Sequence, residues 1–214
     1  MSSAPPYAFA LCRDEATLDA VFALRRLANV ASGRADASAP LSAWRDGWDG
    51  RSEIVVARDG TGTVVATVRV SAPEPNDEWL CGPYVDTLSA EARAATAEVS
   101  RVAVHPDRRG GGLAVTMAAF MCVLTWRSGR RRCVGCCSED VEGFWTRLGV
   151  QTAPATWWQG RWPMRPRPLM GLTLDVGAAP PTVPHASPLL QRAVRSAWSV
   201  NLGGRQTVST AGAQ

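Results

Sequence analysis

The 214-residue chain is predicted to form an α/β (α+β) domain, in which strands and amphipathic helices share one core. Residues 53–58 and 63–70 are two β-branched runs separated by the turn sequence Asp-Gly-Thr-Gly, which is typical of a hairpin. Residues 101–104 alternate apolar and polar side chains, as a strand does. Residues 113–124 then have the apolar spacing of a helix. These three observations predict the fold class.

The first predicted helix begins at Asp14 or Thr17, because both residue types favour the start of a helix. Its apolar stripe consists of Leu18, Val21, Phe22, Leu24 and Leu27. Residues 28–50 are mostly small and polar but contain two tryptophans, which predicts a loop with a short helical turn. After the hairpin, residues 71–77 predict a proline-rich turn, and residues 88–95 have the propensity of a helix.

The middle of the chain joins a strand to a helix through three consecutive glycines, Gly110, Gly111 and Gly112. Pro106 and Asp107 end the strand. The helix that follows places its apolar residues at i, i+4, i+7, i+8 and i+11, which is one face of about four turns. These residues are Leu113, Met117, Phe120, Met121 and Leu124.

This glycine turn is a candidate phosphate-binding site. The first backbone N–H groups of a helix have no partner within the helix and point beyond its start. Glycines let a diphosphate approach that backbone closely, and the positive end of the helix dipole favours the anion. The alternative is a tight turn without a ligand.

Two common phosphate motifs do not fit this turn. The chain contains no lysine, which excludes a Walker loop. The three glycines are contiguous, and no acidic residue ends the next strand near residues 130–137, which argues against a dinucleotide fingerprint.

Further elements follow the central helix. Residues 133–137 predict a short strand, and residues 140–148 predict a helix that Gly149 ends as a C′ glycine. Residues 169–176 predict a last strand. Residues 151–168 are rich in Trp, Pro and Arg. They line a ligand pocket, bind an acidic face of a partner, or pack against the end of the sheet.

Composition and charge narrow the class of protein. The hydrophobic fraction of 46% and the charged fraction of 20% are ordinary for a soluble domain. The net charge of +4 is too small to indicate a nucleic-acid partner, although it favours an anionic ligand. The sequence shows no apolar span for a membrane and no signal peptide, so the expected location is the cytoplasm.

The six cysteines are expected to be free thiols that are buried or line strands, because the expected compartment is reducing. Cys133-x-x-Cys136-Cys137 lacks a second pair at the spacing of a metal site. The two histidines, His105 and His185, are distant in sequence. The sequence therefore predicts no metal site.

Two segments together resemble the GNAT acyltransferase superfamily. Val104, Pro106, Arg109, Gly112 and Ala114 match its coenzyme-A loop, Val-x-Pro-x-x-Arg/Gln-x-x-Gly-x-Gly/Ala, in order. Phe-Trp-Thr-Arg-Leu-Gly-Val at 144–150 is similar to its Phe-Tyr-x-x-Leu-Gly-Phe segment. The resemblance covers residues 53–150. It implies the GNAT fold, a mixed, mostly antiparallel central sheet flanked by helices, in which the fourth and fifth strands splay apart.

The resemblance also implies a cofactor site for acetyl-CoA or another acyl-CoA and no metal. The diphosphate would be held by backbone N–H groups of Arg109, Gly110, Gly111, Gly112, Leu113 and Ala114. The thioester oxygen would be polarised by backbone amides of the strand residues Val102, Ala103 and Val104, with Trp145 at the thiol end. The basic turn at 129–132 either contacts the adenosine phosphate or caps a helix.

In this superfamily the region between the first two strands covers the acceptor. The acceptor-pocket candidates are therefore Trp44, Asp46, Trp48 and Asp49. For the two tryptophans, packing on the core is the alternative.

An acceptor amine is mostly protonated at neutral pH, so its proton must be removed. Glu98 stands where several members of the superfamily carry a general base, and a salt bridge to Arg101 or Arg93 is the alternative. Trp145 occupies the position of a tyrosine acid in many relatives, and an indole cannot replace a phenol in that role. The candidate substitutes are Tyr84, Ser138 and Cys137. A thiol with a pKa of ~8.5 is also able to leave unprotonated.

A narrower resemblance concerns the acyl donor. Asp49 before a strand and Glu98-Val99-Ser100-Arg101 within a strand are similar to the branch of N-acyl amino acid synthases and acyl-homoserine-lactone synthases. That branch implies acyl carrier protein thioesters as donors. The first expectation is an N-acyltransferase that moves an acyl group, expected to be acetyl, from acyl-CoA to the amine of a small molecule by direct attack on the thioester. The second is a synthase that depends on an acyl carrier protein, and the third is a non-catalytic coenzyme-A binding module.

The predicted domain organisation is a single GNAT-like acyltransferase domain at residues 1–176 and a Pro/Ala-rich, partly disordered tail at residues 177–214. Within the tail, residues 189–198 predict a short amphipathic helix and residues 201–214 predict disorder.

Overall fold

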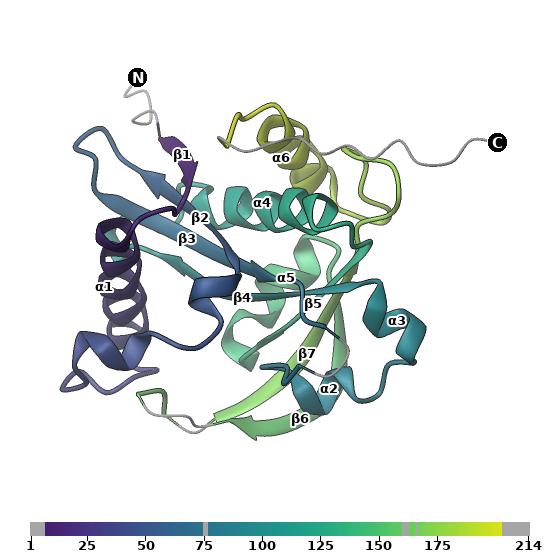
Figure 1. The fold of residues 1–214 in the computed structure, drawn as a ribbon, viewed down its shortest axis with the longest axis horizontal. Coiled ribbons are helices and arrows are strands. Elements are labelled where there is room, and N and C mark those ends of the chain that lie inside the picture. The colour runs from purple at the N-terminus through teal and green to yellow at the C-terminus, as the bar shows by residue number, and fades with distance from the viewer. Residues whose placement is uncertain (1–6, 75–76, 160–162, 166, 203–214) are drawn as a thin grey trace.

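The computed structural model describes residues 7–74, 77–159, 163–165 and 167–202. Within these residues the strands form one sheet in the order β1-β2-β3-β4-β5-β7-β6 (Figure 1). Neighbouring strands are antiparallel except β4 and β5, which are parallel. The predicted mixed, mostly antiparallel sheet is therefore confirmed. The strands are β1 (Ala8–Leu11), β2 (Glu53–Arg58), β3 (Val64–Ser71), β4 (Thr96–Val104), β5 (Arg132–Cys137), β6 (Gln151–Gln159) and β7 (Arg167–Asp175).

Helices cover both faces of this sheet. Helix α1 packs on one face, and α4 with α6 outside it packs on the other (Figure 1). The α-helices are α1 (Glu15–Ala31), α2 (Gly82–Val85), α3 (Ala90–Ala94), α4 (Leu113–Arg127), α5 (Glu142–Arg147) and α6 (Pro188–Trp198). Short 3-10 turns are η1 (Leu41–Trp44), η2 (Asp49–Arg51), η3 (Pro106–Arg108) and η4 (Glu139–Val141). None of the described helices is both long and apolar enough to span a membrane.

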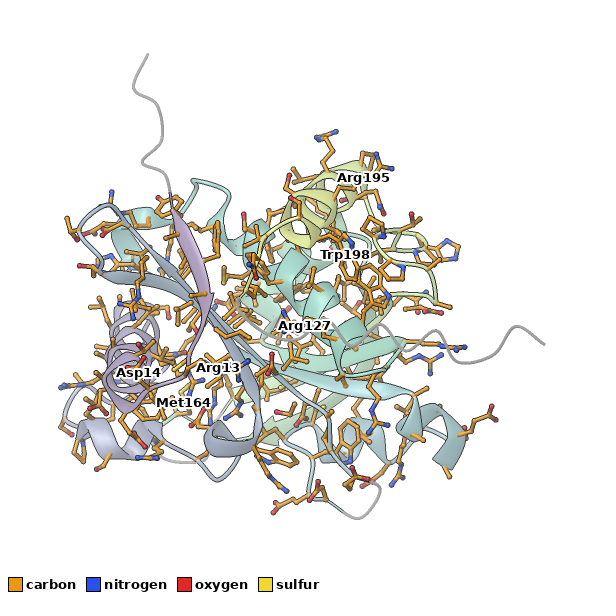
Figure 2. The ribbon with its side chains drawn as sticks, turned by 45° about the horizontal axis from the view of Figure 1, so that its top comes forward. Arg13, Asp14, Arg127, Met164, Arg195 and Trp198 are labelled. Atoms are coloured by element: carbon orange, nitrogen blue, oxygen red, sulfur yellow. The ribbon has the colours of Figure 1, made fainter. Side chains whose placement is uncertain are left out.

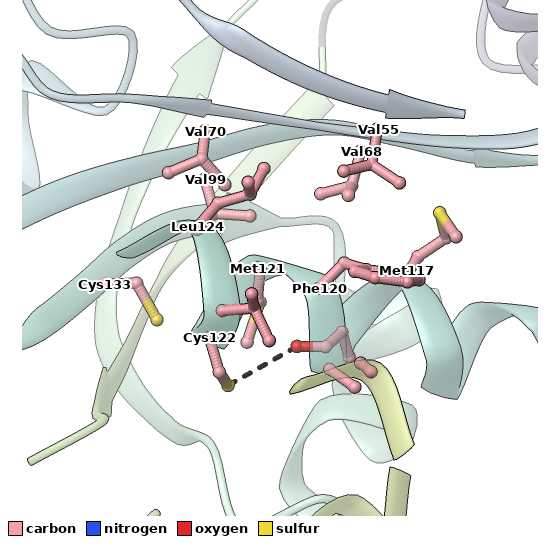
Figure 3. Close-up of a cluster of buried hydrophobic side chains, with 14 of the residues drawn as sticks. Val55, Val68, Val70, Val99, Met117, Phe120, Met121, Cys122, Leu124 and Cys133 are labelled. Atoms are coloured by element: carbon pink, nitrogen blue, oxygen red, sulfur yellow. Dashed lines mark hydrogen bonds between the residues drawn. The ribbon is translucent and has the colours of Figure 1, made fainter. Parts of the chain in front are cut away.

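The alternation of side chains in the hairpin explains how one sheet serves two helical layers. Val55 and Ala57 of β2 face the core cluster beneath α4, whereas Ile54 and Val56 face the cluster beneath α1. Figure 3 shows the first cluster, where valines of β2, β3 and β4 meet the buried face of α4. Each such side chain stabilises the fold by about 1.5–3 kcal/mol. Both faces of the hairpin are buried, which explains why valine and isoleucine dominate its strands.

Most predicted elements are confirmed with small shifts at their ends. Asp14 caps α1, and its carboxylate accepts a hydrogen bond from the Thr17 backbone N–H at 2.7 Å. The helix predicted at 140–148 consists of the turn η4 and the helix α5. Gly149 follows with φ +89°, as a C′ glycine does.

Two strands were not predicted. β1 has only four residues, too few for a periodic signal. β6 lies at the edge of the sheet, and a register shift between Ala153 and Thr156 accommodates Pro154, which has no N–H for a ladder. The Trp, Pro and Arg composition of this segment therefore gives no strand signal, although the segment forms an edge strand. Arg161 and Trp162 of the same segment lie outside the described residues.

The predicted C-terminal helix is present as α6 and packs on α4. Leu190, Val194 and Ala197 are buried in the cluster beneath it. Trp126 of α4 meets Trp198 edge to face, with ring centroids 5.6 Å apart. The predicted boundary after residue 176 stays a prediction, and residues 203–214 of the predicted disordered tail lie outside the described residues.

We expect Gly149→Ala to lower the free energy of unfolding by about 2–4 kcal/mol. A Cβ atom at this position would lie 2.4 Å from the His185 carbonyl oxygen, in a backbone conformation that already disfavours L residues. The matched control is Gly62→Ala, since Gly62 has φ +84° but open space around it. Urea denaturation should show a loss of only about 1 kcal/mol for the control. Equal losses would contradict the contact with His185.

Candidate functional site

Strands β4 and β5 pair at one end and diverge at the other. Their parallel register covers Thr96 to Glu98 of β4 and, within the described residues, goes no further. β4 remains paired with β3 as far as Val104, whereas β5 follows β7. A Cβ atom on Gly135 would lie 2.8 Å from the Val99 carbonyl oxygen, so a glycine stands where β5 leaves β4. The predicted splay of the fourth and fifth strands is therefore confirmed.

A cavity of about 500 Å³ occupies the space between the diverging strands. Its apolar lining belongs to the core cluster beneath α4 and includes Val99, Met121, Trp145, Val150, Leu172 and Leu174. Its polar lining includes Arg34, Asp46, Glu98, Arg101, Ser138 and Arg167. The volume is that of a small-molecule site. The cavity therefore offers a ligand both an apolar and a charged surface.

The glycine turn adjoins this cavity. Gly110 and Gly112 have φ of +81° and +82°, and a Cβ atom on either would meet open space. Helix α4 has no side-chain cap, and its first internal hydrogen bond runs from the Thr116 N–H to the Gly112 carbonyl at 3.0 Å. The N–H groups of its first turn are thus left for a ligand or water. Arg109 and Ala114, on either side of the glycines, line the cavity.

The predicted cofactor residues divide into two groups in the structure. Those that line the cavity are Val102, Ala103, Val104, Arg109, Ala114 and Trp145. Gly110, Gly111 and Gly112 lie in the exposed turn beside it. The Leu113 side chain is buried in the core, which leaves only its backbone N–H for a ligand. The binding roles of these residues stay predictions.

A bulge shapes β4 at the cavity wall. The β3–β4 register shifts between Thr67 and Arg69. Opposite the shift, Arg101 has φ +57°, a conformation that costs a non-glycine residue about 1–3 kcal/mol. The Arg101 guanidinium donates to Oδ2 of Asp46 at 2.9 Å. This ion pair holds the bulge, and the bulge aims Arg101 at the cavity.

Asp46 belongs to a buried network of three arginines and two aspartates. Asp49 accepts from Arg25 at 2.7 Å and from Arg69 at 2.9 Å, and Arg69 also donates to Asp46 at 2.5 Å. The side chains of Arg25, Arg69 and Asp49 are at most 1% exposed. Charge-assisted hydrogen bonds of this kind are the strong ones. The network ties α1, η2, β3 and β4 to one another.

The charges of the network shift the pKa of its members. Burial acts to raise the pKa of Asp46, but the hydrogen bonds and charges of Arg69 and Arg101 outweigh it and hold that pKa well below its usual range. Burial lowers the pKa of Arg25 to about 10, against the opposing effect of Asp49. Both groups are therefore ionised at neutral pH.

Of the four acceptor-pocket candidates, Asp46 alone is among the described residues that line the cavity. Asp49 lies inside the network. Trp44 packs in the cluster beneath α1, and Trp48 stacks on Arg51, whose guanidinium carbon is 3.6 Å from the ring centroid. For the tryptophans, the core-packing alternative is therefore the one observed.

Arg25 and Arg69 were not predicted to be buried, paired charges, although their positions in the sequence indicate it. Arg25 lies on the apolar face of α1, three residues after Phe22 and four after Val21. Arg69 interrupts a strand whose other residues are apolar or small. A charged residue on a face that is otherwise buried indicates a paired internal charge.

Glu98 is 1% exposed and lines the cavity. Its carboxylate accepts the backbone N–H groups of Leu80 at 3.1 Å and Cys81 at 2.8 Å, and the Cys81 thiol at 2.8 Å. The alternative of a salt bridge to Arg101 or Arg93 is wrong, because Arg101 pairs with Asp46 and Arg93 with Asp86. The role of Glu98 as a base stays a prediction.

The substitute acids lie in different places. Ser138 and Cys137 line the cavity; the Ser138 hydroxyl donates to Asp140, and burial raises the pKa of Cys137 to about 11. Tyr84 does not line the cavity. Its ring covers Gly171, where a Cβ atom would lie 2.7 Å from the ring, and its hydroxyl bonds to Thr173. The structure thus brings Ser138, but not Tyr84, to the cavity.

The six cysteines are free thiols. Burial raises the pKa of Cys133 and Cys136 to about 12, so both are neutral thiols at pH 7. The Cys122 thiol donates to the Ala118 carbonyl at 3.5 Å within α4 (Figure 3). Across the part of the chain that the structure describes, no group of three potential metal ligands comes together.

The basic turn at 129–132 follows the C-terminal end of α4, about 22 Å from the glycine turn at 1.5 Å per residue. Arg130 donates to the carbonyl oxygens of Ala94 and Pro73. The position and contacts of this turn fit the alternative of a basic helix end. A contact with the adenosine phosphate stays a prediction.

We expect Asp49→Asn to lower the free energy of unfolding by about 3–5 kcal/mol, because it leaves the guanidinium groups of Arg25 and Arg69 buried with less opposing charge. The control is Arg13→Ala, which breaks an exposed pair with Glu53 and should cost about 0–1 kcal/mol. Urea denaturation measures both. A loss of under 1 kcal/mol for Asp49→Asn would show that the network does not stabilise the fold.

No protein-family model matches the sequence, and no curated protein matches it either. Solved structures do match. The chain is similar to a CoA-dependent acyl-homoserine lactone synthase, BjaI, with a TM-score of 0.62 and 16% identity over 90% of this chain and 88% of that chain. FeeM, an N-acyl amino acid synthase from uncultured soil microbes, matches with a TM-score of 0.57 and 15% identity over 81% and 92%.

An N-acetyltransferase from Staphylococcus aureus Mu50 matches with a TM-score of 0.56 and 18% identity, over 79% of this chain and 98% of that chain. These similarities span both kinds of enzyme to which the sequence motifs point. The chain therefore has the GNAT fold that its glycine turn and its Phe-Trp-Thr-Arg-Leu-Gly-Val segment predicted.

Proposed function

We propose that this chain is an N-acyltransferase that moves an acyl group from acyl-CoA to the amine of a small molecule. One observation carries the proposal: the glycine turn at the start of α4 adjoins the cavity formed where β4 and β5 diverge. An anion-binding turn beside a partly apolar cavity suits a ligand with a diphosphate and a long thioester arm. The names of the similar solved structures support the same class of reaction.

In this proposal the backbone binds the donor. The N–H groups from Arg109 to Ala114 hold the diphosphate, and that binding energy orients the distant thioester. Beyond Glu98, the β4 edge that faces β5 has no strand partner among the described residues. Backbone amides between Val102 and Val104 are therefore available to polarise the thioester oxygen.

The chemistry needs one base and no obligatory acid. The amine nitrogen attacks the thioester carbon, the C–S bond breaks, and the thiolate leaves. Glu98 accepts the amine proton, directly or through water. Trp145 at the cavity wall supplies packing rather than a proton. A leaving thiol of pKa ~8.5 departs as the thiolate, or Ser138 protonates it.

A second candidate is an acyl-carrier-protein-dependent N-acyl amino acid synthase. The apolar lining favours it, because Met121, Val150, Leu172 and Leu174 offer an apolar surface to a longer acyl chain. Acetyl is the expected acyl group of the first candidate, and a longer chain is the expected one of the second.

Thiol release by the purified chain separates these candidates. The donors are acyl-CoAs of increasing chain length and the same acyl groups on an acyl carrier protein, each with a panel of amines. Turnover with acyl-CoA supports the first candidate, and turnover with the loaded carrier protein alone supports the second. Thermal stabilisation by coenzyme A without turnover on any donor would reject both in favour of a binding module.

We expect Gly112→Glu to raise the dissociation constant for acyl-CoA by about 100-fold or more, because a carboxylate would occupy the diphosphate site. The matched control is Gly62→Glu, which places the same side chain at a similar φ in the β2–β3 turn. Calorimetry should find wild-type affinity in the control. Unchanged affinity in Gly112→Glu would rule out the glycine turn as the phosphate site.

We expect Glu98→Gln to lower kcat by about 100-fold with little change in acyl-CoA affinity, because an amide cannot take the amine proton. The amide oxygen still accepts backbone hydrogen bonds, and thermal unfolding checks that the contacts with Leu80 and Cys81 survive. A variant with the kcat and pH profile of the wild type would exclude Glu98 as the base.

A further inference from the structure

The arginines around the cavity differ in whether their charge is already paired. Three of them bind carboxylates: Arg34 with Asp140, Arg45 with Glu15, and Arg101 with Asp46. Arg109 donates to the Ala28 carbonyl at 3.0 Å. Arg167 has no ion pair or hydrogen bond with any described residue, and its Nη1 atom is fully buried. One cation on the cavity wall therefore lacks a partner among the residues that the structure describes.

The surroundings of Arg167 compensate its charge only in part. Burial lowers the pKa of this guanidinium, Arg34 lowers it further, and Asp140, already bonded to Arg34, opposes the shift. Arg101 and Arg167 both lower the pKa of Cys136, which places both cations near that thiol in the cavity wall. A guanidinium remains charged at neutral pH under these shifts. A buried donor without an acceptor is costly, so the site suits an anionic ligand.

The position of Arg167 points to the acceptor rather than to the donor. The segment before it bridges to the residues that follow α1, where Met164 pairs with Ala35. Met164 packs against the cluster beneath α1 (Figure 2). The glycine turn begins α4, which covers the other face of the sheet (Figure 1). Donor phosphates and Arg167 therefore approach the cavity from different layers.

We propose that Arg167 binds a carboxylate on the acceptor, so that the acceptor is an amine that also carries an anionic group, as an α-amino acid does. The inference rests on the proposed function and names the substrate class of the same cavity. A guanidinium binds a carboxylate through two parallel hydrogen bonds, which fixes orientation as well as position. The carboxylate end is held near β7, and the amine is directed toward the thioester beside β4.

Paired acceptors test this proposal. Leucine and phenylalanine are compared with their decarboxylated counterparts, 3-methylbutylamine and phenethylamine, using the acyl donor that turns over. Arg167→Gln is expected to raise KM for both amino acids by about 10- to 100-fold and to change KM for the two amines less than about 2-fold. Arg167→Lys should restore part of the affinity, because it keeps the charge but loses the bidentate geometry.

The control variant is Arg195→Gln, which removes one exposed positive charge from α6, far from Met164 in Figure 2. It is expected to match the wild type with every acceptor. Equal losses for amino acids and amines in Arg167→Gln would assign this residue a purely structural role. A comparable loss of coenzyme-A affinity would assign it to the donor phosphates. Either result overturns the proposal.

A binding measurement keeps the inference separate from the proposed function. Calorimetry in the presence of coenzyme A compares N-acetylleucine with its uncharged methyl ester. If the wild type binds N-acetylleucine more tightly than the ester and Arg167→Gln loses this preference, the anion site is supported. This conclusion holds even if no donor turns over, and in that case only the proposed function fails. Equal binding of acid and ester overturns the anion site whatever the turnover.

Discussion

The buried carboxylate of Asp49, held between Arg25 and Arg69, is the constraint on which one wall of the cavity depends. The network contains three guanidinium groups and two carboxylates, so its positive charge exceeds its negative charge by one. Desolvation of these ions is costly, and the network persists because each carboxylate bridges two arginines. It thereby fixes α1 and η2 against the bulge of β4, and the bulge in turn sets the wall of the cavity.

A second constraint works on the other side of the same strand. β4 and β5 pair over three residues and then separate, and the cavity exists only because the ladder stops there. The core beneath α4 supplies its apolar wall, and the layer beneath α1 supplies arginines. A single separation of two strands therefore gives the cavity both an apolar and a charged surface.

Local chemistry explains which features could be predicted. Gly110–Gly112, Pro106 and the spacing from Leu113 are adjacent in sequence, so the strand, turn and helix could be read without tertiary information. The buried network could not, because Arg25, Asp49 and Arg69 lie 20 or more residues apart and meet only after folding. Tyr84 is a candidate acid by its rough proximity in sequence, but its ring packs on the bare backbone of Gly171, a contact that no local pattern reveals.

In the proposed function, a division between backbone and side chains would let the donor site persist at the 15–18% identity that separates this chain from the solved structures that it matches. Diphosphate and thioester would be held by main-chain N–H groups. Nearly every type of residue carries this group, so the sequence can vary provided that the glycine turn stays open. In the proposed function the acceptor would meet side chains instead, because Asp46, Arg101 and Arg167 line the cavity. Under that proposal, substitutions on this wall would change which amine is bound without disturbing the donor site. Specificity in this chain should therefore reside in its arginines.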